Sequence, residues 1–395
     1  MNRDRFLNSS AGRVITVGTG ESAYSAFVPN PLPPDLSPDN EIATVLFDAA
    51  YALGELAALG RAIPNPHLLI APFLRREAVL SSKIEGTQTT VTDLYAYEAR
   101  QLPIPGFEPK VPESDVREVA NYVSALEYGL ERLNTLPVSL RLIRELHERL
   151  LQGVRGERAR PGQFRADQNW IGRPGSELQD AEYVPPPVAE MEAALDALEK
   201  YLHAEDRENS PLLRLASIHY QFEAIHPFRD GNGRIGRLLL SLLLVNWNLL
   251  PLPMLYLSAY FESHREQYYN LLLDVSARGA WRQWILFFLR GVSEQAHDAS
   301  SRAKQLQDLR STWRKRLIQA RGSALPLQLA DSLFALPVVT IPEAQRLLNV
   351  TYRSAQLNVE KLIKAGILHQ IGESSYGKTY IAEDIIKAIA DQNAR

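Results

Sequence analysis

The chain has 395 residues, of which 45% are hydrophobic and 23% are charged, and it contains no cysteine. This length allows two or three domains, and the lack of thiols excludes disulfides, zinc–thiolate sites and cysteine nucleophiles. The formal net charge of -3 indicates no general affinity for nucleic acids or membrane surfaces.

The first 39 residues are polar and then rich in proline, without helical periodicity. We expect an extended N-terminal arm over 1–39 that lies on a domain surface, partly in polyproline II conformation. Its first residues lack the apolar core of a signal peptide. Asparagines and prolines interrupt the most apolar run, Leu238–Leu257, leaving about eleven helical residues where a membrane span needs about twenty. We therefore expect a cytoplasmic protein without a membrane span.

Most of residues 40–300 carries apolar side chains at helical spacing, which predicts an all-α region. The predicted helices cover 41–60, 65–86, 115–133, 139–151, 188–203, 211–225, 238–245, 262–275 and 281–291. A loop over 103–112 and a basic segment over 155–166, with glycines and a proline, separate some of them. We divide this region into N-terminal helices (40–114) and a core (115–300).

The second predicted helix ends in Ser81-Ser-Lys-Ile-Glu85-Gly86, where Gly86 is placed as a C-terminal cap. Ser81 and Glu85 lie one turn apart and therefore on one helix face. An acidic side chain in the last turn opposes the helix dipole, which costs a few tenths of a kcal/mol unless a cation compensates. A solvated glutamate at a helix end is nevertheless the commoner interpretation of these residues alone.

A short β-hairpin is predicted over residues 168–187. Its two limbs are Gln168-Asn-Trp-Ile-Gly172 and Glu182-Tyr-Val-Pro-Pro-Pro187, and they bracket a turn containing Gly, Pro and Ser. By itself this pattern is that of an ordinary surface hairpin.

The most distinctive segment of the chain is His226-Pro-Phe-Arg-Asp-Gly-Asn-Gly-Arg-Ile-Gly-Arg237. A glycine-rich turn that opens a helix offers unpaired backbone N–H groups and the positive end of the helix dipole to an anion. Arg234 and Arg237 can bind further anionic oxygens, and Asp230 can hold a Mg²⁺ ion that bridges phosphates. A histidine ordinarily titrates near neutrality, so His226 can act as a general base. The segment predicts a nucleoside triphosphate site with its own base.

Three other interpretations compete. The stretch 231–236 fits the dinucleotide fingerprint G-x-G-x-x-G, but the residues before it look helical and no acidic residue follows about twenty positions later. A Walker loop would need Gly-Lys-Ser/Thr at its end, which Gly236-Arg237-Leu238 does not supply. A helix N-terminus whose glycines only turn the chain and whose arginines are solvated stays open on these residues alone.

The C-terminal part, 301–395, has a different character. Residues 302–395 carry about six more basic than acidic side chains. Residues 340–349 and 351–365 are typical of a helix-turn-helix, and 366–372 and 378–381 of the two strands of a wing. The second helix is expected to present Arg353, Gln356, Asn358 and Lys361 outward. This surface would suit DNA, although winged helices also dock proteins.

The segment 226–237 resembles the signature of the Fic (Fido) family, H-P-F-x-D/E-G-N-G-R-x-x-R, at every fixed position. The resemblance covers about residues 25–300 and implies an enzyme that transfers AMP from ATP to protein hydroxyls. It implies that His226 deprotonates the target hydroxyl, that Asp230 holds Mg²⁺ and that Phe228 anchors the loop. The implied ATP site further contains Gly231, Asn232, Gly233 and Gly236, with Asn232 and neighbouring amides at the α-phosphate, Arg234 at the middle phosphate and Arg237 at the γ-phosphate.

Three other features are implied by the same resemblance. Ser81, Glu85 and Gly86 match the inhibitory motif S/T-x-x-x-E-G/N, which implies that Glu85 pairs with the γ-phosphate arginine and prevents productive ATP binding. The hairpin 168–187 corresponds to a flap that holds the target by strand addition. The residues implied nearest to the nucleotide are Ile171 and Gly172 beside the reacting phosphate, and, by a loose alignment, Tyr268 and Ser276 in the adenine pocket.

We therefore predict a Fic-type all-α core with a small hairpin flap and a C-terminal winged helix. The predicted activity is transfer of AMP from Mg-ATP to a Ser, Thr or Tyr hydroxyl, autoinhibited by Glu85. The alternatives are a DNA-binding regulator with a nucleotide-sensing core, and a Fic enzyme that also removes AMP or uses another phosphate donor. Self-modification, a homodimer and DNA binding are left open, and the sequence does not identify the target. Because all motif residues precede about residue 300, the C-terminal domain is expected to be dispensable for the chemistry.

Overall fold

The structure is a computed structural model of the chain. It describes residues 1–20, 23–36, 39–62, 67–100, 112–154, 159–173, 175–204, 210–319, 324–371 and 378–389. Most of the loop predicted over 103–112, the first residues of the basic segment, the start of the second predicted helix and the tip of the predicted wing lie outside these residues.

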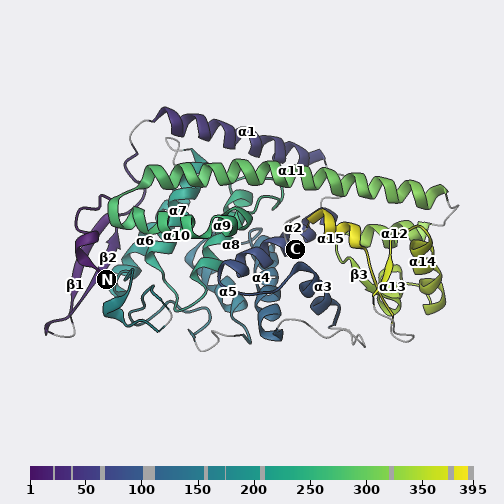
Figure 1. Cartoon of the computed structure of the whole chain (residues 1–395), viewed down its shortest axis with the longest axis horizontal. Helices are drawn as coiled ribbons and strands as arrows, with labels where there is room; N and C mark the ends of the chain where they lie inside the picture. Colours follow the sequence, from purple (N-terminus) through teal and green to yellow (C-terminus); the bar gives the residue numbers. More distant parts are fainter. Residues whose placement is uncertain are drawn as a thin grey trace. The chain divides into compact units, whose positions relative to one another are not determined.

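The described residues are mostly helical, as predicted (Figure 1). The helices are α1 (Asn40–Ala62), α2 (His67–Ile84), α3 (Val91–Arg100), α4 (Glu113–Arg132), α5 (Leu140–Leu150), α6 (Val188–His203), α7 (Pro211–Ile225), α8 (Asn232–Asn246), α9 (Ser258–Ser263), α10 (Arg265–Arg278), α11 (Trp281–Gln319), α12 (Ala324–Ser332), α13 (Ile341–Leu348), α14 (Tyr352–Lys364) and α15 (Glu383–Ile389). The strands are β1 (Gly12–Val17), β2 (Tyr24–Pro29), β3 (Val338–Thr340), β4 (His369–Ile371) and β5 (Thr379–Ile381).

The chain divides into two compact units. The first comprises Met1–Gly54, Ser124–Leu249 and Leu257–Ala296, and the second comprises Glu55–Val123, Leu250–Tyr256 and His297–Arg395. The predicted domain boundaries at 114/115 and 300/301 are therefore not the boundaries of these units. Both predicted boundaries fall within continuous helices, α4 and α11, and so do the unit boundaries at 123/124 and 296/297.

In the first unit, α7 packs against α6, α8 and α10, and α5 packs against α8. The predicted helix over 238–245 is confirmed as the main part of α8, where every side chain from Arg234 to Leu244 is buried. Trp284 of α11 is also fully buried and donates its indole N–H to the Ala216 carbonyl of α7 at 2.9 Å. The junction between α7 and α8, which carries the segment 226–237, is thus surrounded by packed helices.

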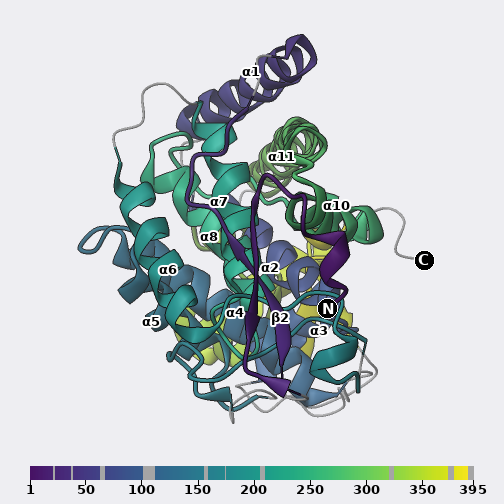
Figure 2. The same ribbon diagram turned by 90° about the vertical axis from the view of Figure 1, so that its left-hand side faces the viewer.

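The expected N-terminal arm is instead largely a β-hairpin. Strands β1 and β2 pair antiparallel, from Gly12 opposite Pro29 to Val17 opposite Tyr24, and they run side by side in Figure 2. Phe27 is fully buried and its N–H donates to the Val184 carbonyl at 2.9 Å. In the sequence, the many prolines of residues 1–39 indicated an extended arm, although the short run Val14 to Val17 also favoured a strand. Contacts with residues far along the chain stabilise the strands.

The second unit contains α2, α3, the C-terminal part of α11 and a three-stranded antiparallel sheet in the order β3-β5-β4. The two helices predicted between 340 and 365 are confirmed as α13 and α14, and their assignment to a winged helix stays a prediction. Asn358 was expected to point outward, but it is 3% exposed and its side chain donates to the Ser354 carbonyl within α14. Within this unit α15 packs against α2, and β3 against α3.

Helix α1 is long and apolar enough, by length and composition alone, to cross a membrane, and 28% of its most apolar window is buried. A single helix of this kind is weak evidence, because core helices of soluble proteins share these properties. Its exposed face carries Phe47 and Tyr51, whose rings stack with centroids 6.4 Å apart.

Candidate functional site

His226 lies where α7 ends, in a strained backbone conformation. Its φ and ψ of 49° and 60° are left-handed, and its N–H donates to the Phe222 carbonyl at 3.0 Å. For a residue other than glycine this conformation costs on the order of 1–2 kcal/mol. Such strain persists only where surrounding contacts enforce it, and it is frequent at functional sites.

The imidazole of His226 has a defined orientation. Its Nδ1 lies 3.3 Å from the Glu223 carbonyl oxygen, which can only accept a hydrogen bond. In the tautomer that makes this hydrogen bond, the neutral ring carries its proton on Nδ1 and its lone pair on Nε2. The ring is half-buried, so Nε2 can accept a proton from a hydroxyl group that approaches the site.

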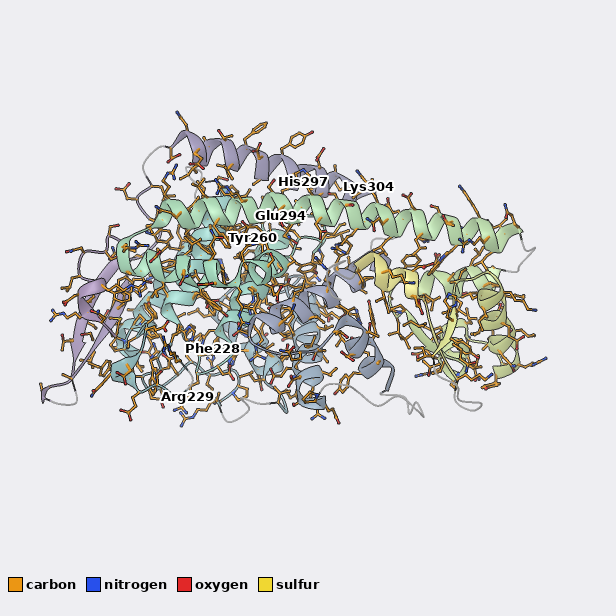
Figure 3. The ribbon with its side chains drawn as sticks, viewed as in Figure 1. Phe228, Arg229, Tyr260, Glu294, His297 and Lys304 are labelled. Carbon is orange, nitrogen blue, oxygen red and sulfur yellow. The ribbon has the colours of Figure 1, made fainter. Side chains whose placement is uncertain are left out.

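The loop between the two helices is anchored by Phe228 and Asn232. Phe228 is fully buried, whereas the adjacent Arg229 reaches the surface (Figure 3). The Asn232 side chain accepts the Phe228 N–H through Oδ1 and donates through Nδ2 to the Phe228 carbonyl, both at 2.8 Å. Phe228 is thus the buried anchor that was expected. Asn232 is 2% exposed and its side chain holds the loop, and its expected place at the α-phosphate stays a prediction.

The start of α8 has the backbone expected of an anion site. Gly231 has φ 79°, a conformation that glycine adopts without strain, and it directly precedes Asn232, the first residue of α8. The first N–H groups of α8 have no partners within the helix and lie at the positive end of its dipole. Gly236 lets α7 and α8 approach, because a Cβ there would lie 3.3 Å from the Phe222 ring.

Asp230, Arg234 and Arg237 surround this helix start. Asp230 accepts the Gly231 N–H through Oδ1 at 2.6 Å, and the same oxygen lies 3.5 Å from the Arg234 guanidinium. The Asp230 side chain is 45% exposed, whereas Arg234 and Arg237 are 4% and 2% exposed. The site therefore combines one accessible carboxylate with two buried cations.

The site fits a Mg²⁺ ion only together with a phosphate ligand. Among the described residues, no three His, Asp or Glu side chains converge on a common point. Mg²⁺ in nucleotide sites is nevertheless usually held by one or two carboxylates together with substrate phosphates and water. The described hydrogen bonds of Asp230 all use Oδ1, which leaves its second oxygen on a half-exposed side chain for such an ion.

His147 of α5 is a site residue that sequence reasoning missed. Its ring stacks on Phe228 with centroids 3.7 Å apart and an interplanar angle of 5°. Its Nδ1 accepts the Gly162 N–H at 2.9 Å, so Nε2 carries the proton and donates to the Asp230 carbonyl at 3.0 Å. Burial lowers the pKa of His147 to about 4, which keeps this arrangement neutral near pH 7. A histidine inside a predicted helix gave no signal of this role.

Arg165 and Asn169 were also missed, and both contact the His226 carbonyl. Arg165 donates through Nε at 3.1 Å, and Asn169 through Nδ2 at 3.3 Å. The Asn169 Nδ2 also donates to the Phe228 carbonyl at 2.9 Å. Arg165 is 3% exposed, and burial lowers its pKa to about 10, so the guanidinium stays charged at neutral pH.

The predicted hairpin 168–187 is reduced to one antiparallel bridge between Ile171 and Tyr183. The Ile171 N–H donates to the Tyr183 carbonyl at 2.9 Å, and the Tyr183 N–H donates back at 3.1 Å. The prolines after Val184 cannot donate ladder hydrogen bonds, which limits the pairing. Ile171 and Gly172 are both exposed, as a flap residue that binds a target strand must be.

Tyr268 and Ser276, which the resemblance places in the adenine pocket, are both buried. Tyr268 is 1% exposed, stacks on Phe261 and makes a 2.8 Å hydrogen bond between its hydroxyl and His219 Nε2. Ser276 is 2% exposed and its hydroxyl lies 2.9 Å from that of Tyr220. Both side chains pack in the aromatic core of the first unit, and their place in an adenine pocket stays a prediction.

The three residues of the inhibitory motif lie at the end of α2, in the second unit. Ser81 is fully buried, Glu85 is exposed, and Gly86 has a positive φ of 102° at the position predicted for the cap. The pairing of Glu85 with Arg237 would join the two units and stays a prediction.

Two protein families match the chain. Residues 43–131 match the family described as Fic/DOC family N-terminal, and residues 137–244 match the Fic/DOC family. The second match includes the whole segment 226–237 together with His147, Arg165 and Asn169.

Curated relatives and one solved structure agree with these matches. The chain is 29% identical over 173 residues to Protein adenylyltransferase Fic of Drosophila grimshawi, covering 42% of this chain and 32% of that protein. It is 28% identical over 222 residues to the protein of the same name from Nematostella vectensis, covering 55% and 47%. It thus spans less than half the length of either relative. A Fic family protein from Desulfovibrio desulfuricans G20 shares the fold, with a TM-score of 0.56 at 19% identity over 89% of this chain and 98% of that one.

Proposed function

The chain belongs to the Fic/DOC family through residues 43–131 and 137–244, and on this premise we propose that it is a protein adenylyltransferase. The proposed reaction transfers AMP from ATP to a Ser, Thr or Tyr hydroxyl of a target protein and releases pyrophosphate. The observation that carries the proposal is the placement of His226, with its Nδ1 proton committed to the Glu223 carbonyl, directly before the anion-binding start of α8.

The proposed mechanism is proton removal combined with charge stabilisation. His226 Nε2 takes the proton of the target hydroxyl while its oxygen attacks the α-phosphorus of ATP, and the bond to the pyrophosphate oxygen breaks. The backbone N–H groups at the start of α8 and the buried guanidinium groups of Arg234 and Arg237 bind the phosphate oxygens. Asp230 would hold Mg²⁺, which when bound neutralises charge on the phosphates.

The activity is tested with ATP labelled in either the α- or the γ-phosphate, incubated with the purified full-length chain and with cell lysate. We expect α-label on protein and no γ-label, because only AMP is transferred. His226→Ala should abolish the transfer while equilibrium binding of ATP survives, since Asp230, the other side chain of the loop that can accept a proton, would be committed to Mg²⁺. Transfer of γ-label would refute AMP transfer, and activity of His226→Ala within tenfold of wild type would remove His226 from its role.

We also propose that Glu85 restrains this activity. A carboxylate bound to the γ-phosphate arginine would compete with ATP, and an arginine–carboxylate pair is strong enough for such competition. Glu85→Gly should then raise AMP transfer on the order of ten- to a thousandfold, equivalent to about 1.4–4 kcal/mol. The double variant with Arg237→Ala should be no more active than Arg237→Ala alone. Unchanged or lower transfer by folded Glu85→Gly would contradict the restraint.

A further inference from the structure

The segment of residues 165–169, which precedes the bridge residue Ile171, connects the flap to the catalytic loop through side-chain contacts. Its alternate residues all contact the loop that carries the histidine. Arg165 donates to the His226 carbonyl, Asp167 forms an ion pair with Arg229, and Asn169 donates to both the His226 and Phe228 carbonyls.

In the part of the chain that the structure describes, the acceptors of Arg165 belong to the loop, the flap and the segment just before the flap. Besides the His226 carbonyl, its guanidinium donates to the carbonyls of Asp167 and Pro186, and its own N–H donates to the Pro227 carbonyl at 2.9 Å. Asp167 and Pro186 lie on the incoming and outgoing limbs of the flap. One buried side chain therefore holds both limbs and the histidine together.

The outgoing limb of the flap contacts the backbone on the N-terminal side of His226. Tyr183, the bridge partner of Ile171, is 5% exposed and donates its hydroxyl to the Ala224 carbonyl at 2.8 Å. Ala224 lies two residues before His226, in the last turn of α7. The two limbs of the flap are thus hydrogen-bonded to the backbone before and after His226, the residue with the left-handed conformation.

From these contacts we propose that Arg165, Asn169 and Tyr183 are positioning residues through which the flap fixes the backbone of His226. They hold the left-handed conformation that directs Nδ1 to the Glu223 carbonyl and leaves Nε2 as the base. A target strand that pairs with the exposed edge at Ile171 would tighten the same contacts, so that target binding and alignment of the base are coupled. This inference rests on the proposed AMP transfer and names residues that act on its base.

The test compares Asn169→Ala, Arg165→Lys and Tyr183→Phe in the full-length chain. Asn169→Ala and Tyr183→Phe each delete hydrogen bonds to carbonyls of the loop or of α7. Arg165→Lys keeps the charge, but its single ammonium nitrogen cannot replace the three guanidinium nitrogens that donate to three different carbonyls. We expect α-label transfer to fall ten- to a hundredfold for Asn169→Ala and Arg165→Lys and three- to tenfold for Tyr183→Phe. The dissociation constant for ATP should change less than threefold, because none of these side chains is placed at the phosphates.

A second readout needs no catalysis. NMR of the chain with isotopically labelled histidine reports the imidazole tautomer, and the His226 signal is identified by its loss in His226→Gln. We expect a defined Nδ1-protonated ring in wild type and a mixture of tautomers in Asn169→Ala and Arg165→Lys. The controls are Arg214→Lys, which changes a buried arginine donating to the Tyr201 and Ala204 carbonyls, and Asn30→Ala, which removes a side chain donating to the Ser10 carbonyl.

The controls should leave both transfer and the His226 tautomer as in wild type. The proposal is overturned if the folded variants keep wild-type transfer and tautomer, or if transfer and ATP affinity fall in parallel. It is also overturned if the control variants disturb the tautomer equally. If wild type transfers no AMP but its tautomer responds to the variants as expected, the positioning role stands and the proposed function fails, so the two failures are distinguishable.

Discussion

Buried His219 makes the stability of the protein dependent on pH. The side chain is 1% exposed, and burial, followed by the charge of Arg237, lowers its pKa to about 3 from an ordinary value of 6.5. Between these two pKa values the unfolded chain binds a proton that the folded chain does not bind. The stabilisation from His219 is therefore complete above about pH 6.5 and is lost as the pH falls toward 3.

The magnitude follows from this linkage. At about pH 5 the unfolded imidazole is almost fully protonated and the folded one is neutral, so His219 lowers the free energy of unfolding by about 2 kcal/mol relative to about pH 8. His219→Phe removes the titrating group and keeps an aromatic ring among Phe261, Tyr268 and Trp284. The variant also loses the hydrogen bond to Tyr268, which costs about 1 kcal/mol at any pH in this range.

The assay is urea unfolding of the full-length chain without nucleotide, at several values between about pH 8 and pH 5. The difference in unfolding free energy across this range should be about 2 kcal/mol smaller for His219→Phe than for wild type. His203→Asn, a change at an exposed position of α6, should keep the wild-type dependence. An identical dependence in wild type and His219→Phe would show that the folded protein tolerates a charged ring there, and the reasoning from burial would be wrong.

Three further predictions concern the site and the packing. Asp230→Asn, which keeps an acceptor for the Gly231 N–H, should lower Mg²⁺-dependent ATP affinity at least about tenfold. If calorimetric titrations show the same Mg²⁺ dependence of ATP binding in the variant and in wild type, Asp230 does not bind the metal. Gly129→Ala should destabilise the protein by about 1–3 kcal/mol in urea unfolding, because the new Cβ would lie 2.9 Å from a Leu242 methyl. The control Gly54→Ala, with no atom within 4 Å of its Cβ, should not. A chain ending at residue 300 should melt at a lower temperature and bind a hydrophobic dye, because it exposes the faces of α2 and α3 that pack against α15 and β3. An unchanged melting temperature of the remaining helices would show that the C-terminal domain is independent.

The truncation prediction revises what the sequence suggested. The order of motifs indicated a C-terminal domain dispensable for the chemistry, since all motif residues precede about residue 300. Within the second unit, however, Asp298 of α11 pairs with Arg76 of α2 at 3.3 Å and with Arg302 at 2.8 Å, and Arg302 donates to the Ala388 carbonyl of α15. The helix that carries the inhibitory motif is therefore packed against the C-terminal element.

The sequence alone determined the features that depend on neighbouring residues. The run 238–245 indicates a buried helix because all of its side chains except Ser241 are aliphatic. Gly231 and Gly86 mark helix ends because glycine adopts a positive φ without strain. The helices α13 and α14 were predicted from the sequence, and the structure shows that Thr340 and Thr351 cap their N-termini. The chemically important residues of the segment 226–237 are likewise close together in the sequence, so the sequence alone identifies them.

Only the tertiary structure decided which side chains hold that segment in place. Arg165, Asn169 and His147 bind backbone carbonyls that lie 57 to 83 residues away, and any residue type supplies a carbonyl, so no pattern marks the partner. The N-terminal strands were hidden for a related reason, because Phe27 is buried by Phe6 and Tyr183, far from it in the chain. The packing of Tyr268 against Phe261 and His219 is likewise visible only in the tertiary structure.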